Sequence, residues 1–213
     1  MIGAVLWDLD GTLVDSREFH WQSWRDTLAA EGIALTYERF LASFGLRNDR
    51  ILAEWLGPDT APDRLARIGD TKEAEYRRLA ESFGLVPLPG AAEWVARLQA
   101  DGWRQAVASS APRQNIEVML RVLKLDRFFQ ATAAAEDVAR GKPDPEVFLK
   151  ASRMLTMPAS RCIVVEDAPA GIEAARRAGM HCVGVSPGAT LPADLSVESL
   201  EDLAPDAFIR LLP

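Results

Sequence analysis

Four short apolar runs recur along the chain, and the segments between them have the periodicity of amphipathic helices. These runs are "IGAVLW" at 2–7, "RQAVAS" at 104–109, "CIVVE" at 162–166 and "CVGVS" at 182–186. Such alternation is typical of a parallel sheet that is covered by helices on both faces. We therefore expect an α/β protein with a Rossmann-like parallel sheet as its core.

The strand signal is missing between residues 16 and 85, where the chain has only the pattern of successive amphipathic helices. Apolar residues repeat there at helical spacing in three groups: Trp21, Trp24 and Leu28; Phe40, Ile51, Leu52 and Trp55; and Leu65, Ile68, Tyr76 and Leu79. The segment ends at "VPLPGAAEW", where two prolines favour extended backbone and Gly90 precedes a new helix. We predict a catalytic core at 1–15 and 86–213 and a helical cap at 16–85, here called the helical insert. Hinges are expected near 13–16 and 86–90.

The composition argues against several classes of function. Of the 213 residues, 48% are hydrophobic and 26% are charged, which suits a globular chain with a sizeable core. The net charge of −7 and the scattered Lys and Arg residues disfavour nucleic acid as a partner. Cys162 and Cys182 lie in apolar runs, as small buried hydrophobes of a reducing compartment do. With no basic leader and no apolar stretch of ~18 residues, we expect a cytoplasmic protein without a membrane partner, and take a monomer as the working state.

Carboxylates follow two of the apolar runs directly. Asp8 and Asp10 come after the first, where a simple turn at Asp10-Gly11 is the plainer interpretation. Glu166 ends the third run, and Asp167 follows it and precedes a predicted helix that it could cap. Because parallel strands present their carboxyl ends at one edge of a sheet, we expect all four acidic residues to meet there. Such a cluster is costly unless a divalent cation with oxygen ligands neutralises it, which predicts Mg²⁺.

Two further segments carry groups that bind anions. Ser109 and Ser110 follow the second apolar run, and Pro112 opens the next predicted helix, with Ser110 as its expected N-cap. The free N–H groups of such a helix start favour a phosphate oxygen. Lys142 precedes Pro143, which favours an extended backbone and a fixed positive charge, although a lone loop lysine is more often solvated.

Taken in order, these residues resemble the four motifs of the haloacid dehalogenase superfamily, and the resemblance spans nearly the whole chain. The matching residues are Asp8-Leu9-Asp10-Gly11-Thr12, Ser109, Lys142 and Glu166-Asp167. The resemblance implies a modified Rossmann core with a mobile cap, Mg²⁺, and phosphoryl transfer through an aspartyl-phosphate. The helical insert is similar to the cap of the subgroup that holds phosphoglycolate phosphatase, sugar phosphatases and beta-phosphoglucomutase.

The resemblance also implies a role for each motif residue. Asp8 is the implied nucleophile, and Asp10 the implied acid that protonates the leaving oxygen and later deprotonates water. Asp8, the Asp10 carbonyl and Asp167 are implied metal ligands, with Glu166 binding the metal or supporting its ligands. Three groups are implied to hold the phosphoryl oxygens: Ser109, the backbone N–H of Ser110 and Lys142.

Two other classes share parts of this chemistry and fit less well. A receiver module of two-component signalling also combines an acidic cluster with Ser or Thr and Lys, but its chain order differs and it lacks a helical insert. A dehalogenase is disfavoured by Asp10, because a halide leaves without a proton. A small phosphate monoester, such as a sugar phosphate, is therefore the expected substrate of a Mg²⁺-dependent phosphatase.

A sugar phosphate mutase of the beta-phosphoglucomutase type remains the alternative. The segment "DSREFHWQSWRDTL", which contains His20 and Trp24, is similar to that enzyme's first cap helix, and Lys72 in "TKEAEY" matches a cap lysine. The motif "DGTLVDS" looks instead like the phosphatase version, and the spacing around Arg47 in "FGLRNDRIL" departs from the mutase pattern by about one residue. We predict that His20, Arg47 and Lys72 reach the active site from the helical insert, although an arbitrary Arg or Lys is usually a solvated surface residue.

Overall fold

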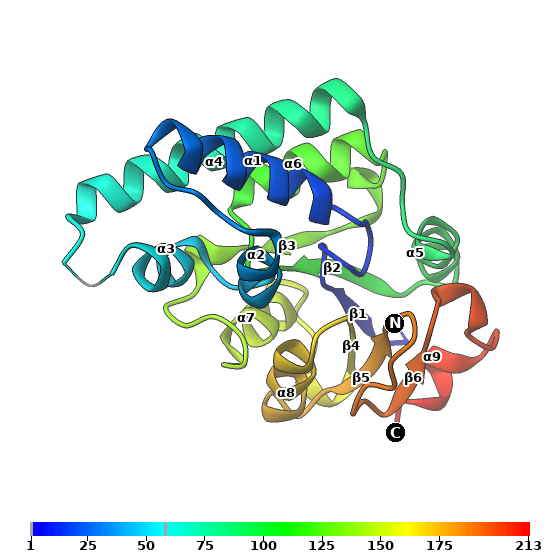
Figure 1. Cartoon of the computed structure of the whole chain (residues 1–213). Coiled ribbons are helices and arrows are strands. Elements are labelled where there is room, and N and C mark those ends of the chain that lie inside the picture. The colour runs from blue at the N-terminus through cyan, green and yellow to red at the C-terminus, as the bar shows by residue number, and fades with distance from the viewer. Residues whose placement is uncertain (1, 58) are drawn as a thin grey trace.

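Six parallel strands form one sheet in the computed structural model, which describes residues 2–57 and 59–213. The strand order is β3-β2-β1-β4-β5-β6 (Figure 1). The strands are β1 Ala4–Trp7, β2 Arg104–Ala108, β3 Ala131–Ala133, β4 Cys162–Glu166, β5 His181–Val185 and β6 Leu195–Val197. This parallel sheet confirms the predicted α/β, Rossmann-like fold class.

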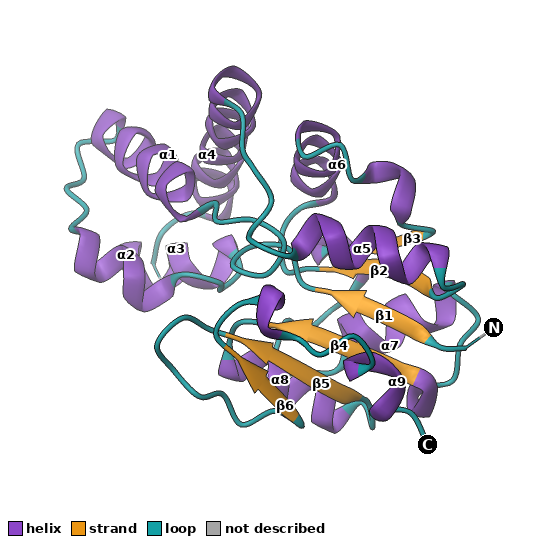
Figure 2. Cartoon of the chain, turned by 90° about the vertical axis from the view of Figure 1, so that its right-hand side faces the viewer, coloured by secondary structure: helices purple, strands orange, loops and turns teal. Residues whose placement is uncertain are grey.

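Helices cover both faces of the sheet. The α-helices are α1 Arg17–Ala30, α2 Tyr37–Ser43, α3 Asn48–Leu56, α4 Pro62–Phe83, α5 Ala91–Ala100, α6 Arg113–Val122, α7 Glu146–Met154, α8 Pro169–Arg177 and α9 Ala207–Arg210. Single turns of 3-10 helix lie at Asp126–Phe128, Ala135–Asp137, Ala159–Arg161 and Leu200–Asp202. Helices α5, α6 and α9 lie on one side of the sheet, and α7 and α8 lie on the other (Figure 2).

The central strand β1 is buried on both faces, which explains its unbroken apolar sequence. Val5 and Trp7 pack in the apolar cluster that includes α5, α6 and α9, whereas Ala4 and Leu6 pack in the cluster that includes α7 and α8. The alternation follows from the two-residue period of a strand. Because β1 is paired with both β2 and β4, the residue that follows Trp7 emerges between the ends of two neighbouring strands.

The four strands predicted from apolar runs are confirmed to within two residues at each end. Strands β3 and β6 were not predicted. Each has only three residues, with sequences "ATA" and "LSV", and most of these residues are only half-buried at the two edges of the sheet. Short edge strands bury too little surface to need a long apolar run, so their pattern does not stand out from loop sequence.

The helical insert has an apolar core of its own. Helices α1 to α4 occupy residues 17–83, and none of the described residues in that span is in a strand. Trp24, Leu28, Phe40, Leu52 and Ile68 are all buried in one cluster that is separate from those of the sheet. These helices lie beyond the carboxyl ends of the strands, where the arrowheads point in Figure 2.

The two connections between the sheet and the helical insert lie side by side. Val14 forms an isolated antiparallel bridge with Pro87, and the Leu88 N–H donates to the Leu13 carbonyl at 2.9 Å. Both connections therefore enter the insert through one paired stretch of backbone. The division into a core at 1–15 and 86–213 and a cap at 16–85 stays a prediction.

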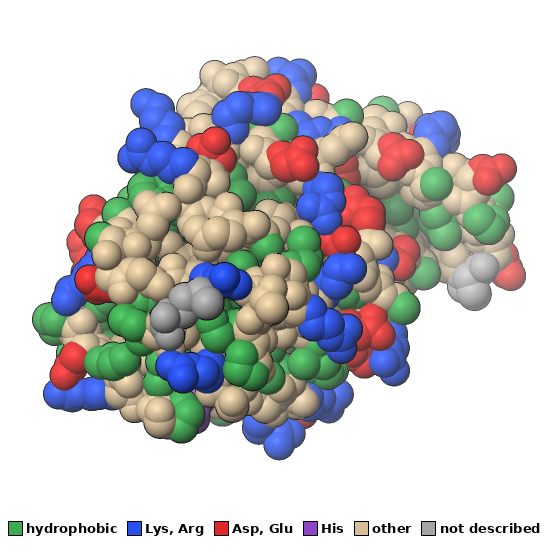
Figure 3. Space-filling view, turned by 180° about the vertical axis from the view of Figure 1, so that it is seen from behind, with side chains coloured by type: hydrophobic (Ala, Val, Ile, Leu, Met, Phe, Trp, Pro, Cys, Tyr) green, Lys and Arg blue, Asp and Glu red, His purple; other side chains and the backbone are tan. Residues whose placement is uncertain are grey.

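Charges of both signs are interspersed on the molecular surface. On the face shown in Figure 3, basic and acidic side chains alternate with apolar ones and do not collect in one large patch. Many charged side chains of the protein pair locally, as Arg176 and Arg177 do with Glu173 on α8. Exposed pairs of this kind contribute only about 0–1 kcal/mol each. None of the helices in the described part of the chain is long and apolar enough to cross a membrane.

Candidate active site

Asp8 is fixed at the end of the most central strand. Its backbone N–H donates to the Val165 carbonyl of β4 at 3.0 Å, so the pairing of β1 with β4 continues through this residue. Its side chain is 10% exposed. Gly11, three residues on, turns the chain toward the helical insert with a φ of 87°, where a side chain would be strained. A Cβ at Gly11 would also meet Asp167 at 2.0 Å, so this glycine lets the two acidic segments approach closely.

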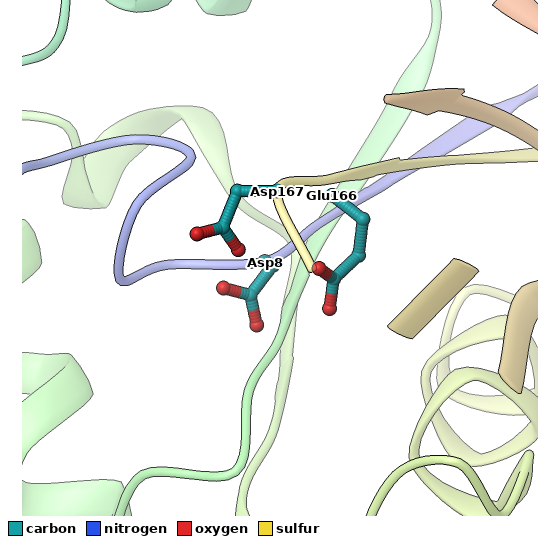
Figure 4. Close-up of side chains that lie close together, drawn as sticks. All are labelled: Asp8, Glu166 and Asp167. Carbon is teal, nitrogen blue, oxygen red and sulfur yellow. The ribbon is translucent and has the colours of Figure 1, made fainter. Parts of the chain in front are cut away.

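Three carboxylates converge at this sheet edge. Asp8 from the end of β1 and Glu166 and Asp167 from the end of β4 each offer an oxygen within 4.8 Å of the others (Figure 4). Burial raises the pKa of Asp8 to about 7, even though Lys142 opposes the shift. Burial and the nearby charge of Asp8 raise the pKa of Asp167 to about 8. Full ionisation of this cluster is therefore unfavourable by itself, and an all-oxygen donor set of this kind fits Mg²⁺.

Lys142 lies inside the site and is not a solvated loop residue. Its Nζ donates to Asp8 Oδ1 at 2.5 Å and to Glu166 Oε1 at 2.6 Å, and its side chain is 8% exposed. Burial disfavours the ammonium, but the two carboxylates outweigh that effect and raise the pKa of Lys142. Glu166 also accepts from the Ala168 N–H at 2.8 Å, which holds its carboxylate toward Lys142. The lysine is thus a fixed positive charge beside Asp8.

Ser109 and Ser110 lie near Asp8 and Lys142, on the wall of a cavity at the strand ends that is described below. The prediction that Ser110 is the N-cap of the next helix is wrong. Helix α6 begins only at Arg113, and Pro112 precedes it in extended conformation with no side-chain cap. The first turn was placed too early, because a proline can precede a helix as well as open it. Ser109 is buried, and its Oγ accepts from the Ala111 N–H at 3.1 Å, which shapes the loop between β2 and α6.

Asp10 lies apart from the three converging carboxylates and faces the helical insert. Its Oδ1 is hydrogen-bonded by Ser16 Oγ and, at 3.4 Å, by Tyr76 OH, and His20 Nε2 also lies 3.4 Å away. Burial works to raise the pKa of Asp10, but the contacts with His20 and Ser16 outweigh it and keep that pKa below its usual range. The ligand role of the Asp10 backbone carbonyl stays a prediction.

The helical insert brings His20 and Lys72 to Asp10. Lys72 is 1% exposed, and its Nζ lies 2.8 Å from His20 Nδ1. The ammonium also lies 5.2 Å from the ring centroids of both Trp24 and Tyr76, which stabilise it through their π faces. His20 stacks on Tyr76 with ring centroids 4.1 Å apart. The plainer interpretation of both residues as solvated surface groups is therefore wrong.

Arg47 lies between the insert and the core. Its guanidinium donates to the carbonyls of Ala135 and Val138 at 3.4 and 3.3 Å, and its Nε lies 3.6 Å from Asp49. Arg47 also lines the cavity. These contacts hold the loop before α3 against the loop after β3. In this structure the guanidinium of Arg47 is thus bound by protein groups at the cavity wall.

Several polar residues of this region were missed at the level of sequence. Ser16 and Tyr76 contact Asp10, and the buried residues Glu73 and Asn115 form a polar cluster with the half-buried Asn48 behind Lys72. The sequence pattern assigns Tyr76 only to the apolar stripe of its helix. The available signal was weak: Asn115 directly precedes Ile116 on the buried side of α6, a position where an apolar residue is usual.

A cavity of about 330 Å³ joins the strand ends to the insert. Its walls include acidic, basic, hydroxyl and aromatic side chains: Asp8, Asp10, Ser109, Ser110, Lys142, Glu166 and Asp167 from the strand ends, and His20, Trp24, Phe40, Phe44, Arg47 and Lys72 from the insert. The volume is at the lower end of the range for small-molecule sites. Every predicted site residue thus borders one cavity, although the roles of these residues stay predictions.

Comparison with known proteins gives consistent matches over most of the chain. The model of the haloacid dehalogenase-like hydrolase family matches residues 5–185. Beta-phosphoglucomutase of Bacillus subtilis (strain 168) is 33% identical over 211 residues, which cover 94% of this chain and 91% of the relative. Fructose-1-phosphate phosphatase YqaB of Escherichia coli (strain K12) is 32% identical over 186 residues, which cover 85% of this chain and 95% of the relative. The crystal structure of CbbY from Rhodobacter sphaeroides in complex with phosphate superposes with a TM-score of 0.88 at 30% identity, covering 99% of this chain and all of that one.

Proposed function

The chain belongs to the haloacid dehalogenase-like hydrolase family, as its motifs predict, and from this premise we propose that it is a phosphatase of small phosphate monoesters. A sugar phosphate or a similar metabolite is the proposed substrate class. The observation that carries the proposal is the convergence of Asp8, Lys142 and Asp167 at the end of the central strands, on the wall of a cavity of small-metabolite size. A rigid strand end holds a nucleophile within the small tolerance that in-line transfer requires.

The proposed reaction has two halves. In the first, a carboxylate oxygen of Asp8 attacks phosphorus, the bond from phosphorus to the ester oxygen breaks, and Asp10 donates a proton to that oxygen. In the second, water attacks the phosphorus of the aspartyl-phosphate, Asp10 accepts a proton from the water, and the bond to Asp8 breaks. Inorganic phosphate leaves and the Asp8 carboxylate is restored.

Asp10 needs a proton in the first half and must lose it before the second. Its contacts with His20 and Ser16 keep its pKa low in the free protein, which favours the ionised form that accepts a proton from water. A dianionic ester bound beside Asp10 raises this pKa by like-charge repulsion. Substrate binding and departure therefore help to switch Asp10 between its acid and base forms.

The remaining groups at the strand ends hold the phosphoryl oxygens. We assign this role to the Ser109 hydroxyl, the Ser110 N–H and the Lys142 ammonium. Donors that are fixed before the reaction stabilise the developing charge without reorganising, and this is the larger part of catalysis in phosphoryl transfer. Lys142 has fixed partners in Asp8 and Glu166, so its position is set before substrate binds.

Mg²⁺ is the proposed cofactor. Asp8 and Asp167 would hold it through their side chains, together with the Asp10 carbonyl, while Glu166 orients Lys142 and supports the cluster. The two positive charges of the ion offset the negative charge of the carboxylates and of the phosphate ester. The pKa values of Asp8 and Asp167, which are raised by burial and by the neighbouring carboxylates, support the assignment, because a bound cation would favour the ionised forms of both groups.

The helical insert is proposed to act as a lid. Its two connections to the sheet are paired at Val14 and Pro87, so a change of backbone angles there would move residues 16–85 together. The cavity lies between the insert and the strand ends, and product needs a way out. If crystals and solution scattering gave one identical closed arrangement with and without a phosphate analogue, the lid would be excluded.

A mutase remains the second candidate, favoured by the relative of that name and by the His20–Lys72 contact. A panel of phosphate monoesters with Mg²⁺ decides between the two. The proposal expects phosphate release from at least one sugar monophosphate. Release from none, together with conversion of beta-glucose 1-phosphate in the presence of a bisphosphate primer, would replace the phosphatase with the mutase.

A further inference from the structure

Glu73 is a buried carboxylate that the proposed reaction does not use. It lies on α4 next to Lys72, its side chain is 7% exposed, and both of its oxygens have partners. Oε1 accepts from Lys72 Nζ at 2.9 Å and from Asn48 Nδ2 at 2.5 Å, and Oε2 accepts from Asn115 Nδ2. A buried charge is costly to keep unless it is paired and hydrogen-bonded, so this set of partners holds Glu73 in one place.

Asn115 ties this carboxylate to the core. It lies on α6, is 1% exposed, and uses both ends of its amide: Nδ2 donates to Glu73, and Oδ1 accepts from Arg77 at 2.8 Å. Glu73 and Arg77 are both on α4, one helical turn apart. The side chain of Asn115 therefore binds two residues on the same side of this insert helix. Helices α4 and α6 are in extensive contact, and Asn115 is the buried polar part of that contact.

From Glu73, the contacts continue through Lys72 and His20 toward Asp10. An ammonium has no lone pair, so Lys72 must donate to His20 Nδ1, and the neutral imidazole then carries its proton on Nε2. That nitrogen is the one that lies 3.4 Å from Asp10 Oδ1. The position of Lys72 therefore selects the tautomer of His20 that can donate to Asp10.

We propose that Glu73 and Asn115 are positioning residues, which hold Lys72 on His20 and thereby align Asp10 for proton transfer to the leaving group. The inference rests on the proposed phosphatase function. According to this inference, the contact between Asn115 on the core helix α6 and Glu73 on the insert helix α4 affects proton transfer by Asp10. The aligned state of Asp10 is complete only where the insert lies against the core.

The plainer interpretation is that Asn115 only stabilises the packing of α4 on α6. The same two helices offer a second contact that does not involve Lys72 or His20: Arg121 Nη2 on α6 donates to Glu81 Oε1 on α4 at 2.9 Å, at the exposed edge of the interface. Replacing Arg121 removes a bond between α4 and α6 and leaves Lys72 untouched. Arg121→Gln is therefore the control for Asn115→Ala.

The kinetic arm of the experiment compares kcat/KM for two aryl esters, phenyl phosphate and 4-nitrophenyl phosphate, with Mg²⁺. Phenol is the poorer leaving group and depends more on protonation by Asp10. Asn115→Ala, and Glu73→Gln as a variant that keeps the side-chain volume, should reduce kcat/KM for phenyl phosphate about tenfold more than for 4-nitrophenyl phosphate. Arg121→Gln should leave the ratio of the two unchanged.

The second arm reads the tautomer of His20 directly by NMR and therefore needs no turnover. His20 and His181 are the only histidines of the chain, so their signals are easily assigned. With ¹⁵N-labelled histidine, the ring nitrogens of His20 should report the Nε2-protonated tautomer in the wild-type protein and a mixture in Asn115→Ala or Glu73→Gln. His181 begins β5, at the end of the strand that points away from the insert, and should not change. Equal losses on both esters, no loss on either, or a His20 tautomer that ignores both substitutions would overturn the inference. If the wild-type protein released phosphate from neither aryl ester and from no sugar monophosphate, the proposed function would fail, and the tautomer alone would decide the positioning role.

Discussion

The strand ends and the helical insert supply functional groups in different ways. At the sheet edge, Asp8, Ser109 and Glu166 follow or end a strand directly, and backbone pairing with neighbouring strands fixes where they lie. In the insert, His20 and Lys72 come from different helices and are held by contacts between side chains. The first set is positioned by the fold, and the second by a network that a single substitution can disturb.

This difference suggests a division of labour. Groups that touch phosphorus and its oxygens need the tolerance that a rigid sheet provides, and they are the same for every phosphate ester. Groups that face the leaving alcohol must differ between substrates, and an inserted set of helices can change without altering the sheet. Substitutions at the strand ends should therefore affect all esters alike, whereas substitutions in the insert should discriminate among them.

The largest effect is expected at the strand end. Asp8→Asn is nearly isosteric but leaves no nucleophilic carboxylate, so phosphate release should fall by roughly four decades or more on every ester. Asp101→Asn is the control, because Asp101 is an exposed carboxylate outside the site and the expected hinges. A folded Asp8→Asn protein with substantial turnover would remove Asp8 from its assigned role.

Metal removal should be nearly as severe, and it has a readout that does not depend on activity. Mg²⁺ should raise the thermal midpoint, with a stabilisation of about 2.7 kcal/mol when its concentration is 100 times its Kd. Asp167→Asn should weaken that stabilisation, and Ca²⁺, which coordinates more loosely, should inhibit. Full activity after exhaustive chelation, or a thermal midpoint that ignores Mg²⁺, would contradict the assignment of a metal site.

A substitution at Gly171, which packs against Glu166, tests whether the strand end is rigid. Gly171 on α8 packs so tightly on Glu166 that an added Cβ would lie 1.8 Å from Oε1, so Gly171→Ala must displace Glu166 and with it Lys142. A misplacement of about 1 Å costs roughly 10²-fold in rate, and this loss should be equal for all esters. Gly69→Ala on α4 is the control, because its Cβ would only touch Leu52 at 3.7 Å. Unchanged kcat in Gly171→Ala would show that the strand end is more adjustable than its packing indicates.

The smallest and most selective effects are expected in the insert. His20→Ala and Lys72→Ala should reduce hydrolysis of a sugar phosphate about tenfold more than that of 4-nitrophenyl phosphate, whose leaving group needs less help from Asp10. The aryl ester serves as the internal control, measured on the same preparation. Equal losses on both would indicate a defect in folding or closure, and no loss on either would return both residues to a structural role.

The sequence predicts the strand ends well because the relevant pattern is local there. An apolar run followed by Asp8, or by Asp167 one residue beyond the strand, places a carboxylate at the sheet edge in any parallel α/β fold. The N-cap at Ser110 was wrong because the exact start of a helix near Pro112 depends on a loop that the local pattern does not determine.

The support behind His20 could not be predicted in the same way. Glu73 and Asn115 are 42 positions apart in the chain, and their contact exists only because α4 packs on α6. A glutamate on a long helix is usually solvated, and nothing beside it in the sequence marks Glu73 as buried. The resemblance to a known family located Lys72, whereas the residues that hold Lys72 in place emerge only from tertiary packing.

The most direct test of phosphoryl transfer to Asp8 is to detect a phosphoryl group bound to the protein during turnover. Wild-type protein is mixed with 4-nitrophenyl phosphate and Mg²⁺, quenched in acid within milliseconds, and digested at low pH for mass spectrometry. If Asp8 is the nucleophile, one phosphoryl group should appear on the peptide that contains Asp8, together with a burst of nitrophenol, and neither signal should appear in Asp8→Asn. A phosphoryl group on a different residue, or rapid turnover by Asp8→Asn without any adduct, would contradict phosphoryl transfer to the end of the central strand.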